Sequence, residues 1–212
     1  MRSFGSLCVV LGMLLPLVLV AQNSGQKGKQ SMGTSGKEIA VVETSMGTFE
    51  MELYPADAPK TVENFVTLAR RKYFDGMRFH RIAKGFVIQT GDPLSKDPAR
   101  ISQWGTGGES IYGKAFEDEL DPNTPSAKAG YEKGAVAMAN TGRPGTNTSQ
   151  FFVCLRDVPL PHQYTIFGRV VKGIDVVEAI GQVEIVPQMG PNDGRPRKDV
   201  VLKKVTIRKS AG

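Results

Sequence analysis

Residues 79–92 read FHRIAKGFVIQTGD, a stretch in which polar side chains are embedded in apolar, strand-type sequence. Its residue types predict strands over Arg78–Ile82 and Phe86–Thr90. Successive side chains of a strand point to opposite faces, so His80 is expected to face away from Arg81. The stretch therefore predicts two strands of a sheet, with His80 as a structural side chain rather than a general base.

Strand-type sequence continues on both sides of this stretch. Toward the N-terminus, two runs flank a short turn in which Gly47 supplies a positive φ, as in a β-hairpin. Apolar and polar residues alternate in the second of these runs, which is typical of a half-buried strand. The strands predicted outside residues 79–92 are Glu38–Thr44, Thr48–Leu53, Ala135–Ala139, Gln150–Leu155, Thr165–Val170 and Val200–Arg208.

Two helices are predicted. Asp57 can cap the first, whose first turn holds Pro59. Apolar residues then follow at i, i+3, i+4 and i+7, and these are Val62, Phe65, Val66 and Ala69. The second helix covers Ile174–Ile180 and ends at Gly181. Eight strands and two short helices predict a mainly β domain, a closed eight-stranded antiparallel barrel capped by two short α-helices.

Composition narrows the class of protein. The 212 residues are 40% hydrophobic and 23% charged, which is ordinary globular usage and excludes a collagen-like, coiled-coil or wholly disordered chain. The net charge of +6 identifies no partner. Two Cys exclude a disulfide scaffold and two His leave little material for zinc, so no metal site is expected.

The N-terminal residues have the pattern of an export signal. Met1 and Arg2 precede fifteen residues, 7–21, that are almost all apolar; a bilayer span needs about 20. Residues 1–21 are therefore predicted to be a signal peptide, with an uncleaved membrane anchor as the alternative. Residues 22–37, rich in Gly, Ser and Lys, are predicted to be a flexible linker, and residues 38–210 to form one domain.

Export has consequences for the cysteines. Cleavage after Ala21 would remove Cys8 and leave Cys154, which lies in the apolar run FFVCL and is expected to be buried. The leader is short and plain, as in bacteria. We expect an exported protein, periplasmic or secreted, that is not stably inserted in a membrane after cleavage.

Six motifs, taken together, resemble one family. Besides residues 79–92 they are AVAMANTG at 135–142, TNTSQFFV at 146–153, GTGGESIYG at 105–113, FEDE at 116–119 and YTIFGRV at 164–170. In this order they resemble the cyclophilin family of peptidyl-prolyl cis–trans isomerases, over nearly all of residues 38–209. The resemblance implies rotation about X-Pro bonds without a cofactor, with proline-containing unfolded or flexible polypeptides as partners.

Such an isomerase breaks no covalent bond. An uncatalysed X-Pro bond rotates in tens to hundreds of seconds, over a barrier of about 20 kcal/mol set by amide resonance. As resonance is lost, the prolyl nitrogen gains a lone pair that accepts a hydrogen bond, and a guanidinium is a rigid, permanently charged donor. The resemblance gives this catalytic role to Arg81. Without the motif, Arg81 would be interpreted as a surface cation on a strand.

The resemblance also implies a substrate groove. Its apolar socket for the proline ring would consist of Phe86, Val87, Phe152 and Leu160, the peptide backbone would be held by Gln89, Asn140 and Gln150, and the groove would also include Ala139 and Tyr164. The alternatives are core packing for the apolar members and internal hydrogen bonds for the amides. Strand alternation sends Phe86 to the face opposite Val87, unless Gly85 permits a local bend.

Two segments depart from the family pattern. Eukaryotic-type cyclophilins often show Trp-Leu-Asp-Gly-Lys-His where residues 159–164 read PLPHQY, so Pro159 replaces the Trp that is linked to cyclosporin binding. Tyr164, in the His position, still presents a ring edge and a hydroxyl. The other segment, Asp92–Trp104, is longer than in the usual bacterial type. It either shapes access to the groove or is a passive insertion.

Other function classes fit the sequence less well. A serine hydrolase would need a nucleophile-elbow motif to join His80 or His162, and none is present. A nucleic-acid binder would need aromatic residues among its cations, which the basic C-terminal strand lacks. The remaining alternative is a chaperone-like module that holds proline-containing segments without turnover. We expect a monomer that binds no nucleic acid.

Overall fold

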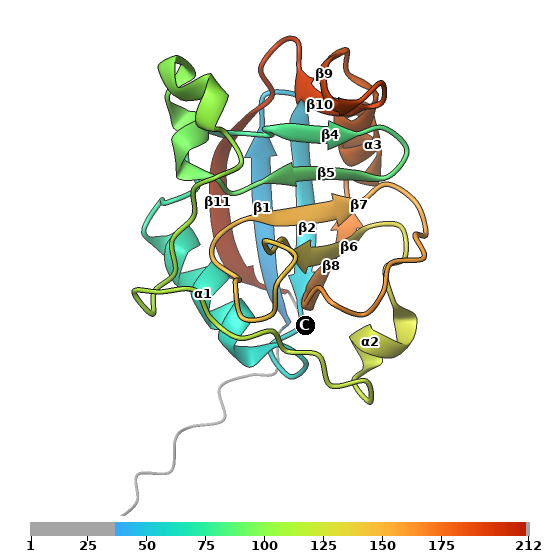
Figure 1. The fold of residues 1–212 in the computed structure, drawn as a ribbon. Helices are drawn as coiled ribbons and strands as arrows, with labels where there is room; N and C mark the ends of the chain where they lie inside the picture. The colour runs from blue at the N-terminus through green and yellow to red at the C-terminus, as the bar shows by residue number, and fades with distance from the viewer. Residues whose placement is uncertain (1–36, 211–212) are drawn as a thin grey trace, which may run out of the picture. The chain divides into compact units, whose positions relative to one another are not determined.

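The computed structural model describes residues 37–210. The predicted signal peptide and residues 22–36 of the predicted linker lie outside the described residues. Residues 37–210 form one antiparallel sheet of eleven strands, with three α-helices and two short 3-10 helices around it (Figure 1). This part of the chain is therefore mainly β, as predicted.

The strands follow one another in the sheet in the order β3-β11-β1-β2-β8-β6-β7-β5-β4-β10-β9. Along the chain they are β1 Glu38–Thr44, β2 Gly47–Leu53, β3 Met77–Arg78, β4 Arg81–Ala83, β5 Val87–Thr90, β6 Ala135–Met138, β7 Phe151–Cys154, β8 Ile166–Lys172, β9 Ile185–Gly190, β10 Asp193–Pro196 and β11 Val201–Lys209. The helices are α1 Pro59–Arg70, η1 Pro93–Lys96, η2 Pro98–Gln103, α2 Pro125–Ala129 and α3 Ile174–Gln182.

The sheet is curled but open, so the predicted closed barrel of eight strands is wrong. The predicted strand Arg78–Ile82 is divided, because β3 pairs with β11 whereas β4 pairs with β5 and β10. Phe79 and His80 lie between the two pieces and carry the chain from one end of the sheet toward the other. A barrel closes only when its first and last strands pair. Here the edge strands β3 and β9 each pair on one side only, among residues 37–210.

The β9–β10 hairpin is the part of the sheet that the sequence does not predict. Pro187, Gly190, Gly194 and Pro196 interrupt it, and such residues normally indicate a loop. The hairpin forms because β10 pairs with β4 while β9 is an edge strand, where a proline disturbs no ladder. It extends the sheet beyond β4 (Figure 1).

Helix α1 begins at Pro59 and buries all four predicted apolar positions. The predicted cap is wrong, because the N-cap residue is Ala58, which makes no side-chain bond. Instead, the Glu119 carboxylate accepts hydrogen bonds from two backbone N–H groups of the first turn, at 3.0 and 2.9 Å. A carboxylate there satisfies free N–H groups and suits the helix dipole. Asp57 accepts a bond from the Ser126 N–H in α2 at 2.8 Å.

The other two α-helices differ from the prediction. Helix α3 continues through Gly181 to Gln182, past its predicted end, and α2 is a third helix where two were expected. Within residues 37–210, none of the helices combines the length and the apolar character needed to cross a bilayer.

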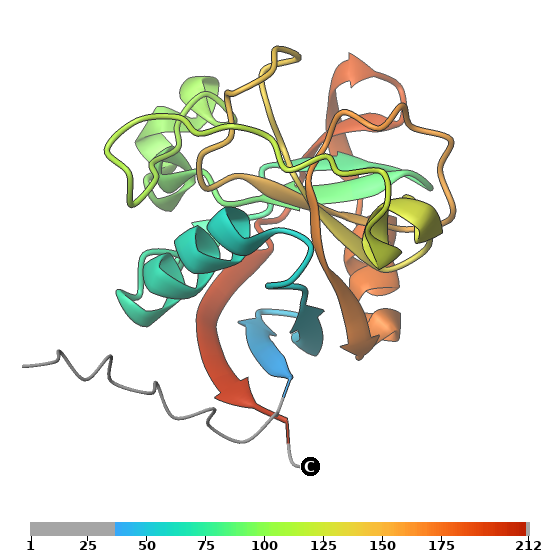
Figure 2. The same ribbon diagram turned by 90° about the horizontal axis from the view of Figure 1, so that it is seen from below.

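The sheet buries apolar side chains on both faces. On β5 and β7, Ile88, Phe151 and Val153 belong to the main core, to which α1 and α3 also contribute. Figure 2 shows α1 lying alongside β11 in this core. The alternate residues Phe152 and Cys154 point to the opposite face, where they join a second, smaller cluster. Cys154 is buried there, as predicted.

Candidate active site

A row of side chains crosses four strands on the face opposite the main core. Arg81 on β4 lies directly opposite Gln89 on β5, Gln89 opposite Phe152 on β7, and Phe152 opposite Ala137 on β6. Directly opposed residues share one face of a sheet. The strand register therefore places a cation, an amide and an aromatic ring side by side, with the small Ala137 next to them.

The turn between β4 and β5 brings Phe86 to this row. The Phe86 N–H donates to the carbonyl of Ala83 at 2.9 Å, and Gly85 has a φ of +67°, which residues with a side chain rarely adopt. Strand β5 begins only at Val87, so Phe86 is not bound by strand alternation. The conflict that alternation posed for Phe86 is resolved by this turn.

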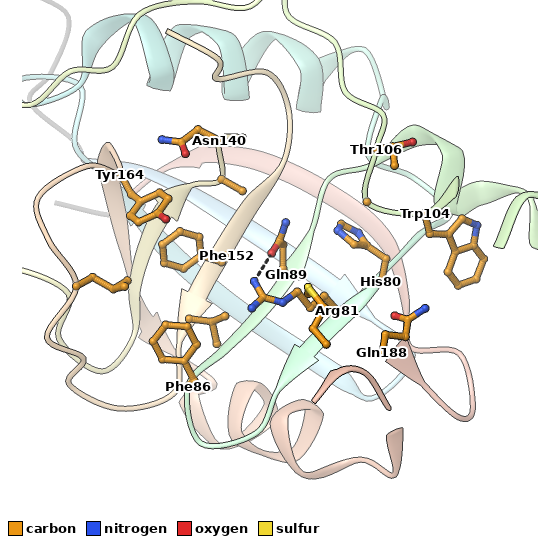
Figure 3. A pocket seen from close by; sticks show the side chains of 15 residues that line it. His80, Arg81, Phe86, Gln89, Trp104, Thr106, Asn140, Phe152, Tyr164 and Gln188 are labelled. Atoms are coloured by element: carbon orange, nitrogen blue, oxygen red, sulfur yellow. Dashed lines mark hydrogen bonds between the residues drawn. The ribbon is translucent and has the colours of Figure 1, made fainter. Parts of the chain in front are cut away.

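These side chains surround a pocket of about 330 Å³ (Figure 3). Nine of the ten predicted site residues line it, namely Arg81, Phe86, Val87, Gln89, Ala139, Asn140, Phe152, Leu160 and Tyr164. The tenth, Gln150, is buried and lines an adjoining cavity that shares Gln89 and Asn140 with the pocket. The volume lies at the lower end of the range for small-ligand sites.

One end of the pocket is apolar. The rings of Phe152 and Tyr164 pack edge to face, with centroids 5.6 Å apart. Tyr131 fixes this pair from behind: its hydroxyl accepts a bond from the Tyr164 N–H at 3.0 Å and donates to the Tyr164 carbonyl at 2.9 Å. Phe86 and Leu160 pack against the same cluster. This end offers apolar contacts on several sides to a small ring.

Arg81 borders the apolar end, where Figure 3 shows its contact with Gln89, and Asp193 holds its guanidinium from a second side. Nε and Nη2 donate to the Asp193 carboxylate at 2.9 and 2.7 Å, and Nη1 donates to Oε1 of Gln89 at 3.1 Å. An arginine has five N–H groups. Contacts among residues 37–210 use three of them, which leaves one on each terminal nitrogen for a ligand. The side chain is 28% exposed.

Three further amide hydrogen bonds link Gln89, and through it Arg81, to the loop at residues 105–107. Nε2 of Gln89 donates to Oε1 of Gln150 at 3.0 Å, and Nε2 of Gln150 donates to the carbonyls of Gly105 and Gly107 at 3.0 and 2.6 Å. In this series of bonds both amide oxygens accept and both amide nitrogens donate, while the second N–H of Gln89 makes no bond among residues 37–210. Gln150 thus makes the internal bonds that the sequence left as its alternative role.

Comparison with known proteins identifies the family. The model of the family "Cyclophilin type peptidyl-prolyl cis-trans isomerase/CLD" matches residues 39–207, which includes every residue of the site. The chain belongs to the cyclophilin family. It is a cyclophilin-type peptidyl-prolyl cis–trans isomerase.

Individual relatives agree with the assignment to the cyclophilin family. This cyclophilin is 50% identical over 153 residues to peptidyl-prolyl cis-trans isomerase-like 1 of Mus musculus, covering 72% of this chain and 84% of the relative. It is 44% identical over 181 residues to peptidyl-prolyl cis-trans isomerase CYP71 of Arabidopsis thaliana, covering 85% of this chain but only 26% of the relative. A crystal structure of a Cryptosporidium parvum cyclophilin matches with a TM-score of 0.70 and 30% identity, covering 82% and 99% of the two chains. All three are eukaryotic proteins, and they do not support the expected bacterial exported form.

Several parts of the pocket of this cyclophilin escaped the sequence analysis. Gln188, Met189 and the Arg81 partner Asp193 lie on the β9–β10 hairpin, which is itself unpredicted. Trp104 ends the Asp92–Trp104 segment and lines the pocket, so this segment shapes the groove. Its signal in the sequence was a single tryptophan within an insertion. Tyr131 gave no signal, because its partner is a backbone group.

The segment at residues 159–164 contributes two side chains to the pocket. Leu160 and Tyr164 line it, whereas Pro159, in the position of the family's Trp, lines a different cavity. The Asn140 amide anchors the segment by donating to the Gln163 carbonyl at 2.9 Å. The departure from the family motif therefore leaves the apolar end of the pocket formed without that Trp.

His80 is 5% exposed and lines the same pocket as Arg81. The expectation that it faces away from Arg81 is therefore wrong, because β4 begins only at Arg81 and strand alternation does not extend to His80. Burial lowers its pKa from 6.5 to about 4, although the nearby Asp92 carboxylate acts in the opposite direction. Neither ring nitrogen has a hydrogen-bond partner among residues 37–210. A neutral, enclosed imidazole agrees with the predicted structural role.

Proposed function

We propose that Arg81 accelerates X-Pro rotation by donating a hydrogen bond to the prolyl nitrogen as the amide twists. The observation that carries this proposal is a fixed guanidinium with two unengaged N–H groups at the edge of an apolar pocket. Planar amide nitrogen is a poor acceptor, so the bond is stronger in the twisted state than in either ground state. Only such a difference lowers the barrier.

One charged donor in a preorganised site can supply a large part of the required rate acceleration. Reducing a time of tens of seconds to milliseconds requires about 10⁴-fold, or roughly 5.5 kcal/mol. Loss of a single preorganised donor typically costs about 10²–10³-fold in other enzymes. The apolar end would supply the rest by holding the proline ring while the preceding residue rotates.

The substrates we propose are proline-containing unfolded or flexible polypeptides. Phe86, Phe152, Leu160 and Tyr164 would contact the proline ring, and Gln89 and Asn140 would hold the neighbouring peptide groups. The Cryptosporidium parvum relative was also studied in the presence of the dipeptide Ala-Pro, at a TM-score of 0.69 and 30% identity to this chain. That likeness supports a proline residue as the group recognised here.

Arg81→Ala tests the proposal. We expect kcat/KM for a blocked Ala-Pro peptide, measured by NMR exchange, to fall about 10²–10³-fold, with the peptide Kd changed less than about threefold. Arg81→Lys should restore little, because an ammonium cannot make the forked contacts.

Arg169→Ala is the matched control, since Arg169 pairs with Glu132 at 2.8 Å outside the pocket. Its kcat/KM should match that of the wild type. Wild-type turnover in Arg81→Ala would refute the role of Arg81. Turnover absent from the wild type itself would favour the chaperone-like module.

We also propose that the clients are exported polypeptides. Support comes from the sequence alone, where Met1 and Arg2 precede a fifteen-residue apolar run at 7–21. Expression of the full chain in a bacterium, followed by fractionation and N-terminal sequencing, tests this. Cleavage near Ala21 with the product outside the cytoplasm is expected. An uncleaved chain in the cytoplasm would contradict export without touching the isomerase activity.

A further inference from the structure

We propose that the pocket has a second compartment, between Trp104 and the β9–β10 hairpin, that binds an apolar side chain of the same peptide one or two residues from the proline. The inference rests on the proposed use of the apolar end for proline. The second compartment makes this enzyme selective among X-Pro segments, because the affinity then depends on a neighbouring side chain as well as on the proline.

The compartment is continuous with the proline end and separated from it by Arg81. Figure 3 shows Phe86, Phe152 and Tyr164 on one side of Arg81, and Trp104 and Gln188 on the other. Both ends belong to the same 330 Å³ pocket. An extended chain advances about 3.3 Å per residue. A peptide whose proline lies in the apolar end of the pocket can therefore place a neighbouring side chain beyond Arg81, in the second compartment.

Trp104 is a rigid apolar wall. Its Nε1–H is already satisfied by the carbonyl of Asp97 at 3.1 Å, and the Arg78 guanidinium lies 5.4 Å from the ring centroid. Arg78 is itself fixed by Asp199 at 2.6 Å and by the Ser95 carbonyl at 2.6 Å. With its polar atom engaged, the indole presents apolar surface to the pocket.

Met189 lines the same pocket from the hairpin, next to Gln188 in the chain, and is unusually open. Its side chain is 66% exposed, the highest value among the exposed large apolar residues of the described part of the chain. Methionine is unbranched and adapts to ligands of different shape. Covering it with an apolar side chain of the substrate removes that surface from water, which favours binding.

The charges around the compartment favour an uncharged occupant. Arg78, beside the Trp104 ring, is paired with Asp199, and Arg81, which lines the pocket, is paired with Asp193, so each guanidinium near the compartment already has a carboxylate. An acidic side chain would compete with these carboxylates, and a basic one would meet two cations. An aliphatic or aromatic side chain avoids both costs.

Trp104 is the only tryptophan in the sequence, so its fluorescence reports on the compartment directly. The probes are blocked Ala-Ala-Pro-Ala-Ala peptides in which Leu replaces one Ala at each position in turn. At one position within two residues of the proline, we expect Leu to bind about 5–10-fold tighter than Ala and to shift the Trp104 emission. The same peptide should show a similar gain in kcat/KM.

Met189→Ser should reduce the Leu-to-Ala affinity ratio to about 2 or less. Met46→Ser is the matched control, because Met46 is an exposed methionine in the β1–β2 turn, 39% exposed and outside the pocket. It should keep the ratio. Equal affinities for all Leu positions, or an unchanged ratio in Met189→Ser, would overturn the proposal. The binding readout needs no turnover, so a failure of the Arg81 mechanism would be seen separately, as turnover retained in Arg81→Ala.

Discussion

Arg81 depends on a carboxylate 112 residues further along the chain. An arginine with four side-chain torsions loses much freedom when it is fixed, and an unpaired one would sample many rotamers. Asp193 engages Nε and Nη2 together, which fixes both the position and the plane of the guanidinium. We expect Asp193 to act as a positioning residue: it sets where the two unengaged N–H groups point, while contacting no substrate itself.

Asp193→Ala should lower kcat about tenfold with KM changed less than about twofold, because the donor is misplaced in the twisted state while ground-state contacts remain. Asp193→Glu should recover part of the loss. Glu184→Ala is the control, since Glu184 pairs with Arg197 at 2.6 Å at the open end of the same hairpin. If Asp193→Ala and Glu184→Ala behave alike in steady-state kinetics, Asp193 has no positioning role.

At the scale of elements, the approach between the end of β5 and the segment before β7 holds the amide chain together. Gly91 follows β5 with a φ of +93°, and a Cβ there would lie 2.3 Å from the Ser149 carbonyl oxygen. The Ser149 hydroxyl in turn donates to the Gly91 carbonyl at 2.7 Å. This contact holds Gln150 within hydrogen-bonding reach of Gln89, and only glycine fits it.

Gly91→Ala should therefore lower the free energy of unfolding by about 3 kcal/mol or more, from a clash with backbone as well as an unfavourable φ. Gly113→Ala separates the two causes, because Gly113 has a φ of +71° but no atom of residues 37–210 lies within 4 Å of a Cβ there. It should cost only about 1 kcal/mol. Urea denaturation of both variants is the measurement. Similar losses in the two would show that the close approach adds nothing.

Some secondary-structure elements could be predicted from the sequence, and one hairpin could not. The strands that alternate apolar and polar residues, such as β2, and the stripe that α1 buries were predicted because one face of each meets the core. The β9–β10 hairpin was missed, since pairing with β4 stabilises it and its own Pro and Gly content opposes it. Asp193 and Met189 were missed with it.

At the scale of the whole molecule, one enclosed imidazole links stability to pH. His80 has a pKa of about 4 in the folded chain, against 6.5 for an ordinary histidine. Between these values the unfolded chain binds a proton that the folded chain does not. The contribution of neutral His80 to the free energy of unfolding is therefore complete above pH 6.5 and is lost as the pH falls toward 4.

We expect the His80 contribution to lower the free energy of unfolding by about 3 kcal/mol between pH 7 and pH 4. Carboxylates titrate in the same range, so the test is a difference between variants. His80→Gln should flatten the fall in urea-derived stability over this window by about that amount, whereas His162→Gln, at an exposed position, should not. Parallel curves for His80→Gln and the wild type would contradict the enclosed, neutral imidazole.

By itself, the sequence determined the mainly β class, the position of most strands and nine of the residues that line the pocket, because local alternation and contiguous motifs specify them. Tertiary structure alone decided that the sheet stays open, that Asp193 holds Arg81, and that Trp104 and Met189 line the pocket. Those features arise from contacts between segments that lie far apart along the chain. Their partners are chosen by register and packing, which leave no local pattern to find.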